Sequence, residues 1–395
     1  MKKKKIIFFI GGLNFGGMER IVFIACELLK NKYDISLMTL YKTNADYDVD
    51  IPTYDLNVPP QAGKINKLIV FLRRLHKTRI MKKRIEADVV FSFGMYSNYL
   101  NALTKKKEKI IMGIRSYDWL TNAFTIPIID RYIVSKFNSV NSVSKLIAHD
   151  AVKYWKISQD KNRVIYNPYD IELINNKSLE IVDDFCFEPD NFYFITMGRL
   201  ANQKGFNHLI HSFKRLYNNY KNVRLIIMGD GNKKDDIDKL IKEYGLDNKI
   251  FLIGGKKNPY KYIKRADCYV LSSHSEGFPN AMVEAMCLGK IVIATNCPSG
   301  PSEIFLNQEK IYLESSTFKI TEFGILTSSF TYDDRYEIRD LTTEEKTYEE
   351  AMEYVYCNFK KLYNIGNNAS KRVSQFNYEV FKQNLILEIN SVLNI

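Results

Sequence analysis

The chain alternates short apolar runs with longer segments of helical periodicity, and it does so in two consecutive series. β-branched and aromatic residues dominate the short runs, whereas apolar residues recur every three or four positions in the longer segments. This alternation is typical of parallel βαβ units. It predicts strands at residues 6–10, 35–40, 88–92, 109–113, 139–143 and 163–165 in the first series, and at residues 193–197, 223–228, 249–253, 268–271 and 291–294 in the second.

The two series are separated by residues 167–190, where prolines and acidic residues break the pattern and predict a linker. A chain of 395 residues is also too long for one ordinary core. We therefore predict an α/β protein with two Rossmann-like domains, residues 1–170 and residues 171–375. The last helical pattern, residues 376–395, suits either domain, and we assign it to the first.

The positive charge of the chain lies in its first half. Residues 1–170 carry 29 Lys and Arg against 15 Asp and Glu, whereas the remainder carries 28 against 30, which together give the net charge of +12. An anionic partner is therefore expected to meet the first domain.

Residues 64–84 carry nine of these basic residues, and apolar residues recur among them at three-to-four spacing: Ile65, Leu68, Ile69, Leu72 and Leu75. Two interpretations of this predicted basic amphipathic helix stay open. It lies on an anionic bilayer, together with the lysines of residues 2–5 and 105–109, or it packs on its own sheet with a solvated basic face. Nucleic acid is not the expected partner, because no aromatic residues are interleaved in the way of single-strand binders.

The six cysteines lie far apart, mostly inside apolar runs, and form no Cys-x-x-Cys pair. This usage predicts a reducing compartment. The basic start is followed by only five apolar residues before two glycines, which predicts a first strand instead of a signal peptide. No stretch approaches the roughly 20 apolar residues that span a bilayer. We expect a cytoplasmic protein, either free or attached to the inner face of the plasma membrane.

The strongest local motif is a pair of glutamates, Glu276 and Glu284, separated by seven residues after a predicted strand. Pro279 suits the first turn of a helix, so Glu284 is expected inside a helix and Glu276 in the loop before it. A carboxylate can accept hydrogen bonds from two neighbouring hydroxyls, so this pair suits a ligand with a sugar at each end.

Two cations, Arg199 and Lys204, stand where an earlier predicted strand runs into a helix. Free backbone N–H groups and positive side chains make such a place a natural site for a diphosphate. Glycines follow the next two strands in the same way, at residues 229–231 and 254–255. Open parallel sheets bind ligands at this edge.

These residues, within the segments GRLANQKGF, IIMGDG, EGFPNAMVEAMCLGK and ATNCPSGPSEI, resemble the C-terminal domain of the retaining glycosyltransferases of family 4. The resemblance implies a GT-B fold, in which two Rossmann-like domains face each other across a cleft. It implies that Arg199 and Lys204 bind the donor diphosphate, that Glu276 touches the transferred sugar and that Glu284 holds the ribose. The other donor-binding residues that it implies are Gly16, Gly17, Gly229, Asp230, Gly277, Phe278, Pro279 and Asn280.

The glycine-rich turn at residues 11–20 also resembles that family, in which the turn faces the donor phosphates and the acceptor. Its glycines do not spell the dinucleotide fingerprint. Gly12 and Glu19 are acceptor-side candidates. Many relatives place a His near the transferred sugar, but the corresponding stretch, residues 113–117, has none, and Arg115 is the candidate replacement.

No metal site is expected. Three Asp-x-Asp matches, at residues 46–48, 48–50 and 236–238, fall in loop-like or highly charged stretches, and the five histidines form no ligand cluster. His274, beside the Glu276 loop, is interpreted as a structural residue. With Arg199 and Lys204 to neutralise the leaving diphosphate, neither a metal nor a cofactor besides the nucleotide-sugar is required.

The sequence thus predicts a retaining, metal-independent hexosyltransferase that uses a nucleotide-sugar, UDP-linked by resemblance, and a glycan or lipid-linked acceptor of a surface polysaccharide pathway. Residues 297–303 resemble members that use galactose- or N-acetylgalactosamine-type donors, and glucose-type donors stay open. The alternatives are a nucleotide-sugar 2-epimerase, a phosphorylase, and a basic membrane- or nucleic-acid-binding protein with a degenerate donor site.

Overall fold

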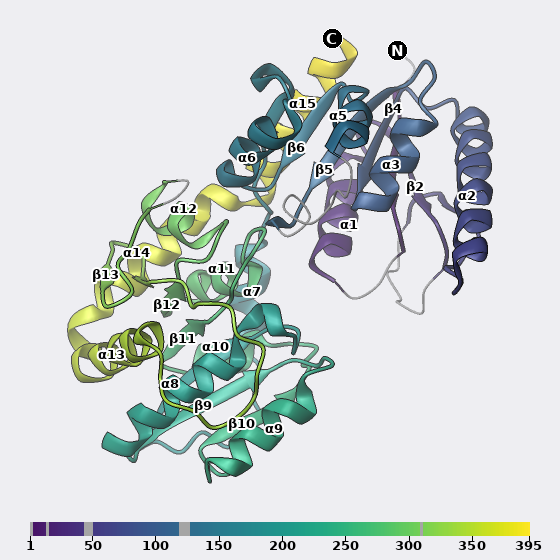
Figure 1. The fold of residues 1–395 in the computed structure, drawn as a ribbon. Helices are drawn as coiled ribbons and strands as arrows, with labels where there is room; N and C mark the ends of the chain where they lie inside the picture. Colours follow the sequence, from purple (N-terminus) through teal and green to yellow (C-terminus); the bar gives the residue numbers. More distant parts are fainter. Residues whose placement is uncertain (1–2, 13–15, 43–49, 118–126, 309–310) are drawn as a thin grey trace. The chain divides into compact units, whose positions relative to one another are not determined.

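The computed structural model describes residues 3–12, 16–42, 50–117, 127–308 and 311–395. The chain divides into two compact units (Figure 1). Unit 1 comprises Met1–Pro168 with Tyr378–Ile395, and unit 2 comprises Tyr169–Asn377. The sequence had suggested the first boundary after residue 170 and the second near residue 376.

Unit 1 is built on a seven-stranded parallel sheet of order β3-β2-β1-β4-β5-β6-β7. Its strands are β1 (Lys5–Ile10), β2 (Asp34–Thr39), β3 (Thr53–Asp55), β4 (Val89–Phe93), β5 (Lys109–Ile114), β6 (Ser139–Ser142) and β7 (Asn162–Val164). Its helices are α1 (Gly17–Leu29), α2 (Lys64–Ile85), α3 (Met95–Leu103), α5 (Pro127–Ser135), α6 (Lys145–Trp155) and α15 (Tyr378–Leu393), with a short 3-10 turn, η1 (Gln159–Lys161).

Helices cover both faces of this sheet. α2, α3, α5 and α6 pack side by side on one face, and α1 packs with α15 on the other. Phe381, Leu385 and Ile389 of α15 are buried in one core with Ile6 and Phe8 of β1. The last helix of the chain is therefore part of unit 1, since its apolar face has the sheet of that unit as its partner.

Unit 2 repeats the design with a sheet of order β10-β9-β8-β11-β12-β14-β13, in which β13 is antiparallel. Its strands are β8 (Phe192–Met197), β9 (Val223–Met228), β10 (Ile250–Gly254), β11 (Cys268–Leu271), β12 (Ile291–Thr295), β13 (Phe318–Ile320) and β14 (Ile325–Thr327). Its helices are α7 (Ile171–Ser178), α8 (Phe206–Asn219), α9 (Lys234–Glu243), α10 (Tyr260–Arg265), α11 (Asn280–Cys287), α12 (Pro301–Leu306), α13 (Thr343–Asn358) and α14 (Tyr363–Val373), with 3-10 turns η2 (Asn202–Lys204), η3 (Phe359–Leu362) and η4 (Ser374–Phe376).

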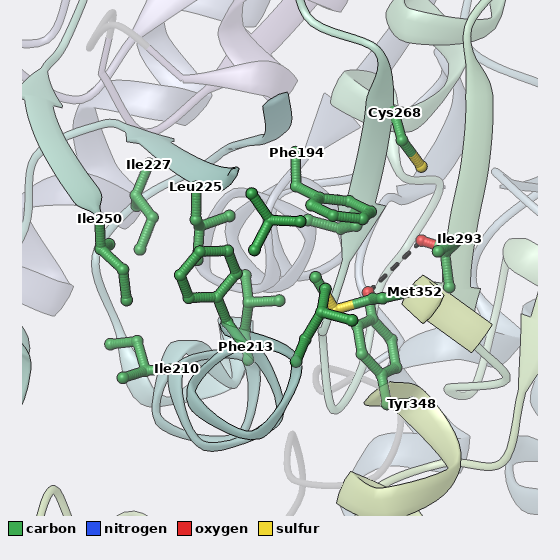
Figure 2. Packing of buried hydrophobic residues seen from close by; sticks show 14 of the residues in the cluster. Phe194, Ile210, Phe213, Leu225, Ile227, Ile250, Cys268, Ile293, Tyr348 and Met352 are labelled. Carbon is green, nitrogen blue, oxygen red and sulfur yellow. Dashed lines mark hydrogen bonds between the residues drawn. The ribbon is translucent and has the colours of Figure 1, made fainter. Parts of the chain in front are cut away.

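The main core of unit 2 lies between this sheet and the pair α8 and α13. Figure 2 shows Phe213 of α8 and Tyr348 and Met352 of α13 packed toward Phe194 and Leu225 of the strands. All five are fully buried, and burying such a side chain contributes about 1.5–3 kcal/mol. This packing gives the loops at the sheet edge a rigid base.

The structure corrects the predicted elements in two places. The expected linker at residues 167–190 contains α7, whose first turn is capped by the Asp170 side chain, which accepts a hydrogen bond from the Leu173 N–H at 2.9 Å. The sequence also missed β3, β13 and β14, each of which is only three residues long. The α/β class, the parallel sheets and the eleven predicted strands are confirmed. No helix in the described part of the chain is long and apolar enough to span a membrane.

Candidate functional site

The candidate donor site is built at the carboxyl edge of the unit 2 sheet. β8 to β12 are parallel to their neighbours, so the loops that follow them share this edge. The motif residues predicted from the sequence stand in these loops, after β8, β9, β10 and β11. The topology therefore gathers residues that lie up to 90 positions apart in the chain.

Lys204 and Glu276 form a partly enclosed ion pair at this edge. The Lys204 Nζ lies 2.7 Å from the Glu276 Oε1, and the Ser273 hydroxyl donates to the same oxygen at 2.6 Å. The Glu276 side chain is 8% exposed and that of Lys204 is 20% exposed. The backbone N–H of Glu276 donates to the Pro298 carbonyl at 3.1 Å, which fixes the loop. A charged pair is thus held at a place where a ligand can reach the cation.

Arg199 supplies a second cation on the same loop as Lys204. Its side chain is exposed, and among the described residues no ion pair or hydrogen bond involves it. A free guanidinium beside a partly committed ammonium group suits an anion with two phosphate groups.

Glu284 lies inside α11, and Glu276 lies in the loop before it, as predicted. The Glu284 side chain is almost fully enclosed, and the Tyr260 hydroxyl of α10 donates to its Oε1 at 3.4 Å. The sequence did not point to Tyr260, because a tyrosine at the start of a short helix is also an ordinary core residue.

Glycines let the loops after β8 and β9 touch each other. Gly229 has φ of +144°, and a Cβ placed there would stand 1.9 Å from the Gly198 carbonyl oxygen. The Asp230 carboxylate then accepts a hydrogen bond from the Gly255 N–H at 2.9 Å. Gly229 and Asp230 were predicted to bind the donor; the structure shows them joining three neighbouring loops into one surface.

Hydrogen bonds and ring packing fix the segment between Glu276 and Glu284. The Ser299 hydroxyl donates to the Gly277 carbonyl at 2.6 Å, and the Tyr169 hydroxyl donates to the Asn280 Oδ1 at 2.6 Å. Phe278 is buried and packs edge-on against Phe376, with ring centroids 5.3 Å apart. The Pro279 ring fits only because residue 300 is glycine: a Cβ there would lie 2.3 Å from the Pro279 Cδ.

The glycine turn of unit 1 is described only in part, since residues 13–15 fall outside the described residues. Gly12 is buried, Gly16 is the N-cap of α1, and Gly17 is its first residue. Glu19 lies in the first turn, folded so closely over Gly16 that a Cβ on that glycine would stand 2.3 Å from the Glu19 Oε2. Burial raises the pKa of Glu19.

Arg115, the acceptor-side candidate of the sequence analysis, forms hydrogen bonds within unit 1. Its guanidinium donates to the Ile165 carbonyl at 2.9 Å and to the Asn141 Oδ1 at 2.6 Å, and Asn141 in turn donates to the Glu388 carboxylate at 2.6 Å. Burial lowers the pKa of Arg115 to about 10, against the opposing effect of the Glu388 charge. These contacts tie β5, β6, β7 and α15 together and give Arg115 a structural role; its acceptor-side role stays a prediction.

The described residues contain no group of three or more His, Cys, Asp or Glu that could hold a metal. Asp46 and Asp48 lie outside them. Asp236 and Asp238 of α9 are paired with Lys233 at 2.8 Å and Lys242 at 2.6 Å.

His274 packs among aromatic rings, with the His208 and Tyr332 centroids each 5.0 Å away. Burial lowers the pKa of His274 to about 4, so the ring is neutral at physiological pH. These contacts fit the structural role predicted for this residue.

Known proteins share this architecture along nearly the whole chain. The Anabaena protein Alr3699/HepE, solved in complex with UDP, aligns with a TM-score of 0.72 at 17% identity, covering 98% of this chain and 100% of that one. Sucrose-phosphate synthase from Thermosynechococcus elongatus aligns with a TM-score of 0.76 at 15% identity, covering 99% and 100%. The chain has the GT-B fold.

Sequence comparisons find relatives that are named as glycosyltransferases. Residues 178–323, within unit 2, match the family model described as glycosyl transferases group 1. An uncharacterized glycosyltransferase of Methanocaldococcus jannaschii is 39% identical over 45% of this chain and 44% of its own length. A Campylobacter jejuni enzyme, N-acetylgalactosamine-N,N'-diacetylbacillosaminyl-diphospho-undecaprenol 4-alpha-N-acetylgalactosaminyltransferase, is 29% identical over 78% of this chain and 84% of its own length. An amylovoran biosynthesis glycosyltransferase of Erwinia amylovora is 26% identical over 76% and 83%. These matches support glycosyltransferase activity.

Proposed function

We propose that this protein is a retaining glycosyltransferase that moves a hexose from a UDP-sugar to a glycan or lipid-linked acceptor in surface polysaccharide biosynthesis. The observation that carries the proposal is the enclosed Lys204–Glu276 pair beside the free Arg199, at the ligand-binding edge of the unit 2 sheet. Solved neighbours in complex with UDP, and with UDP and glucose, support the choice of nucleotide.

The proposed chemistry needs charge stabilisation more than it needs a nucleophile. The bond from the anomeric carbon to the diphosphate breaks while the acceptor oxygen bonds to the same face, and the departing phosphate oxygen takes the acceptor proton. Arg199 and Lys204 would stabilise the charge that develops on the diphosphate. Glu276 would position the transferred sugar, and Glu284 the ribose of the nucleotide. Because two cations compensate the leaving group, we propose that turnover requires neither a divalent metal nor another cofactor.

We also propose that the acceptor is lipid-linked and that the reaction takes place in the cytoplasm. The C. jejuni relative is named for a polyprenyl diphosphate-linked acceptor, which supports the lipid-linked class. Four of the six cysteines are buried and no disulfide joins any of the six, which fits a reducing compartment. We therefore place the reaction in the cytoplasm.

One assay tests the function against its rivals. The purified chain is incubated with labelled UDP-N-acetylgalactosamine, UDP-galactose, UDP-N-acetylglucosamine or UDP-glucose, with and without a lipid-linked acceptor, in EDTA. The proposal expects UDP release and a labelled acceptor product that keeps the donor's anomeric configuration. A new UDP-sugar without acceptor would indicate an epimerase, and transfer only to inorganic phosphate would indicate a phosphorylase. Activity that is lost in EDTA and restored by Mg²⁺ or Mn²⁺ would overturn the metal-free mechanism.

A further inference from the structure

Helix α2 packs against unit 1 through a face that contains two cations. The residues of this face are spaced along one side of the helix and are buried: Val70, Arg74, Thr78, Lys82 and Ile85. The Arg74 guanidinium donates to the Val58 carbonyl at 2.9 and 2.7 Å, and the Lys82 ammonium donates to the Asn101 carbonyl at 2.9 Å and to Glu108 at 2.8 Å. These two charges hold the fold and are not available at the surface.

Four apolar residues of α2 point outward, although one of the two interpretations of the sequence had this helix packed on its own sheet by its apolar side. Ile65 is 76% exposed, Leu68 59%, Ile69 41% and Leu72 55%. Their three-to-four spacing places them in one stripe over the first two turns. Scattered exposed apolar residues are ordinary, but a continuous stripe of four marks an interaction surface. We call these four residues the α2 stripe.

Positive charge surrounds the α2 stripe. α2 contains no acidic residue, and its seven exposed cations are Lys64, Lys67, Arg73, Lys77, Arg79, Lys83 and Arg84. On the side of α2 that faces residues 57–61, a cavity of about 260 Å³ is lined by the polar and basic Asn57, Gln61, Arg73, His76 and Lys77 and by the apolar Val58, Pro59 and Val70. The Lys77 ammonium also donates to the Leu56 carbonyl at 2.6 Å. An apolar stripe with basic flanks is complementary to a surface that is anionic outside and apolar beneath.

The α2 stripe lies at the carboxyl edge of the unit 1 sheet, which is the edge where open parallel sheets bind ligands. α2 connects two parallel strands, β3 and β4, and therefore runs against them, beginning at the carboxyl edge of the sheet. Figure 1 shows α2 along the margin of this unit, next to β2. The apolar turns are the first two, so they lie at the edge where β1 ends at Ile10 and α1 begins at Gly17. A membrane held there would supply a lipid-linked molecule to the same edge.

The other lysine clusters of the first half do not extend this surface. Lys4 pairs with Asp88 at 3.3 Å, and Lys5 pairs with Glu86 at 3.1 Å. Lys105 donates to the Asn138 side chain at 3.1 Å. These lysines stand before β1 and β5, at the amino edge of the sheet, whereas the α2 stripe lies at its carboxyl edge, so they do not extend the surface around the stripe.

We propose that the outward face of α2 docks on an anionic phospholipid bilayer, with the α2 stripe at the acyl boundary and the surrounding cations on the lipid phosphates. The cavity beside Arg73 and Lys77 would receive one headgroup. This attachment is separate from the proposed sugar transfer, because no residue of the candidate donor site takes part in it.

Cosedimentation of the full-length protein with vesicles tests the proposal. Binding to phosphatidylcholine vesicles should rise as phosphatidylglycerol is added, and fall as salt shortens the range of surface charge to about 8 Å at physiological ionic strength. Replacing Ile65, Leu68 and Leu72 with Ser should lower the partition coefficient at least tenfold. The matched control replaces three residues of similar exposure elsewhere, Leu179, Ile181 and Leu387, and should bind as wild type does.

A second variant separates charge from apolar insertion. Replacing Arg73, Lys83 and Arg84 with Gln should lower partitioning about fivefold for each charge removed, and the loss should shrink in high salt. The control variant, with Gln at the exposed Lys239, Lys319 and Lys346 of unit 2, should keep its binding. The Tm and the far-UV circular dichroism, measured alongside, should be unchanged in all four variants, which shows that both units are folded.

Three results would overturn the proposal. The wild-type protein fails to bind anionic vesicles at low salt, or the stripe variant binds as well as wild type. The third is a wild-type dimer in solution that the stripe variant converts to a monomer, because the stripe would then be an interface between two copies of the chain.

Discussion

Both units bury charged side chains, but they use them differently. In unit 2, Lys204 and Glu276 meet at the ligand edge of the sheet, with a free arginine beside them. In unit 1, Arg115 is committed to a backbone carbonyl and to Asn141, and the buried Lys82 pairs with Glu108 at 2.8 Å. The Lys204–Glu276 pair of unit 2 therefore stands at the edge proposed to bind the donor, whereas Arg115 and Lys82 of unit 1 hold strands and helices together.

This comparison predicts that the largest loss of stability follows a change in unit 1. Arg115→Met leaves the Asn141–Glu388 contact without its positive partner, and breaking a buried charged network costs about 3–5 kcal/mol. The urea midpoint should fall accordingly, while the Kd for UDP of the folded protein stays within about twofold. Adding Glu388→Gln should recover part of the stability. An unchanged midpoint with a large loss of turnover would instead return Arg115 to the acceptor site.

Replacing a cation at the candidate donor site of unit 2 should lower activity and leave stability nearly unchanged. Lys204→Ala and Arg199→Ala each remove a charge that we propose to face the leaving diphosphate, so kcat/KM for UDP-sugar should fall by about two orders of magnitude or more. Lys239→Ala, on the exposed face of α9, is the matched control and should keep full activity. Activity within a few-fold of wild type in both site variants would remove the diphosphate assignment.

Two glycines of unit 2, Gly229 and Gly245, test whether close packing of the loops forms the candidate donor site. Gly229 and Gly245 both have positive φ, but a Cβ would collide with the Gly198 carbonyl at the first and meet nothing at the second. Gly229→Ala should destabilise unit 2 by about 3 kcal/mol and weaken UDP binding. Gly245→Ala should cost only about 1–2 kcal/mol for its left-handed backbone and leave UDP binding unaffected. Equal effects on UDP binding would show that the loop contact does not form the site.

The smallest effect concerns Glu349, a buried charge in unit 2 that is far from ligand chemistry. Burial raises its pKa to about 7, opposed by Arg215 at 3.0 Å. The folded state therefore binds a proton more tightly than the unfolded state, and this contribution to stability is lost as the pH rises from about 4.5 to 7.

Glu349→Gln should consequently raise Tm by about 2–4 °C at pH 8 and by less at pH 5. The exposed neighbour Glu350, replaced in the same way, should show no such dependence. A pH-independent difference would mean that the carboxylate is ionised throughout.

The sequence predicted unit 2 better than unit 1, for a physical reason. Gly229, Lys204 and Glu276 stand in the segments that connect a strand to the next helix, so the order of strands and helices was enough to predict their edge of the sheet. Ser273, Tyr260 and Tyr169 were missed, because a hydroxyl signals nothing until its partner across the fold is known.

In unit 1 the sequence left open which side of α2 packs on the sheet. The apolar spacing fits a buried face or a membrane-facing one, and in the structure Arg74 and Lys82 lie inside and the α2 stripe lies outside. The spacing could not show this, because the carbonyl of Val58 and the carboxylate of Glu108, which receive these cations, come from other parts of the chain. The helix itself was predicted; its orientation depended on long-range hydrogen bonds.

The central claim is that the carboxyl edge of unit 2 binds the donor nucleotide, and calorimetric titration of UDP into the full-length protein tests it most directly. Wild type should bind UDP with one site per chain. Lys204→Ala should raise Kd about tenfold or more through the lost phosphate contact, and Glu284→Gln should raise it by a similar factor through the ribose. The unit 1 variant Arg73→Gln should bind as wild type does. Equal UDP affinity in wild type and in both unit 2 variants would contradict the account.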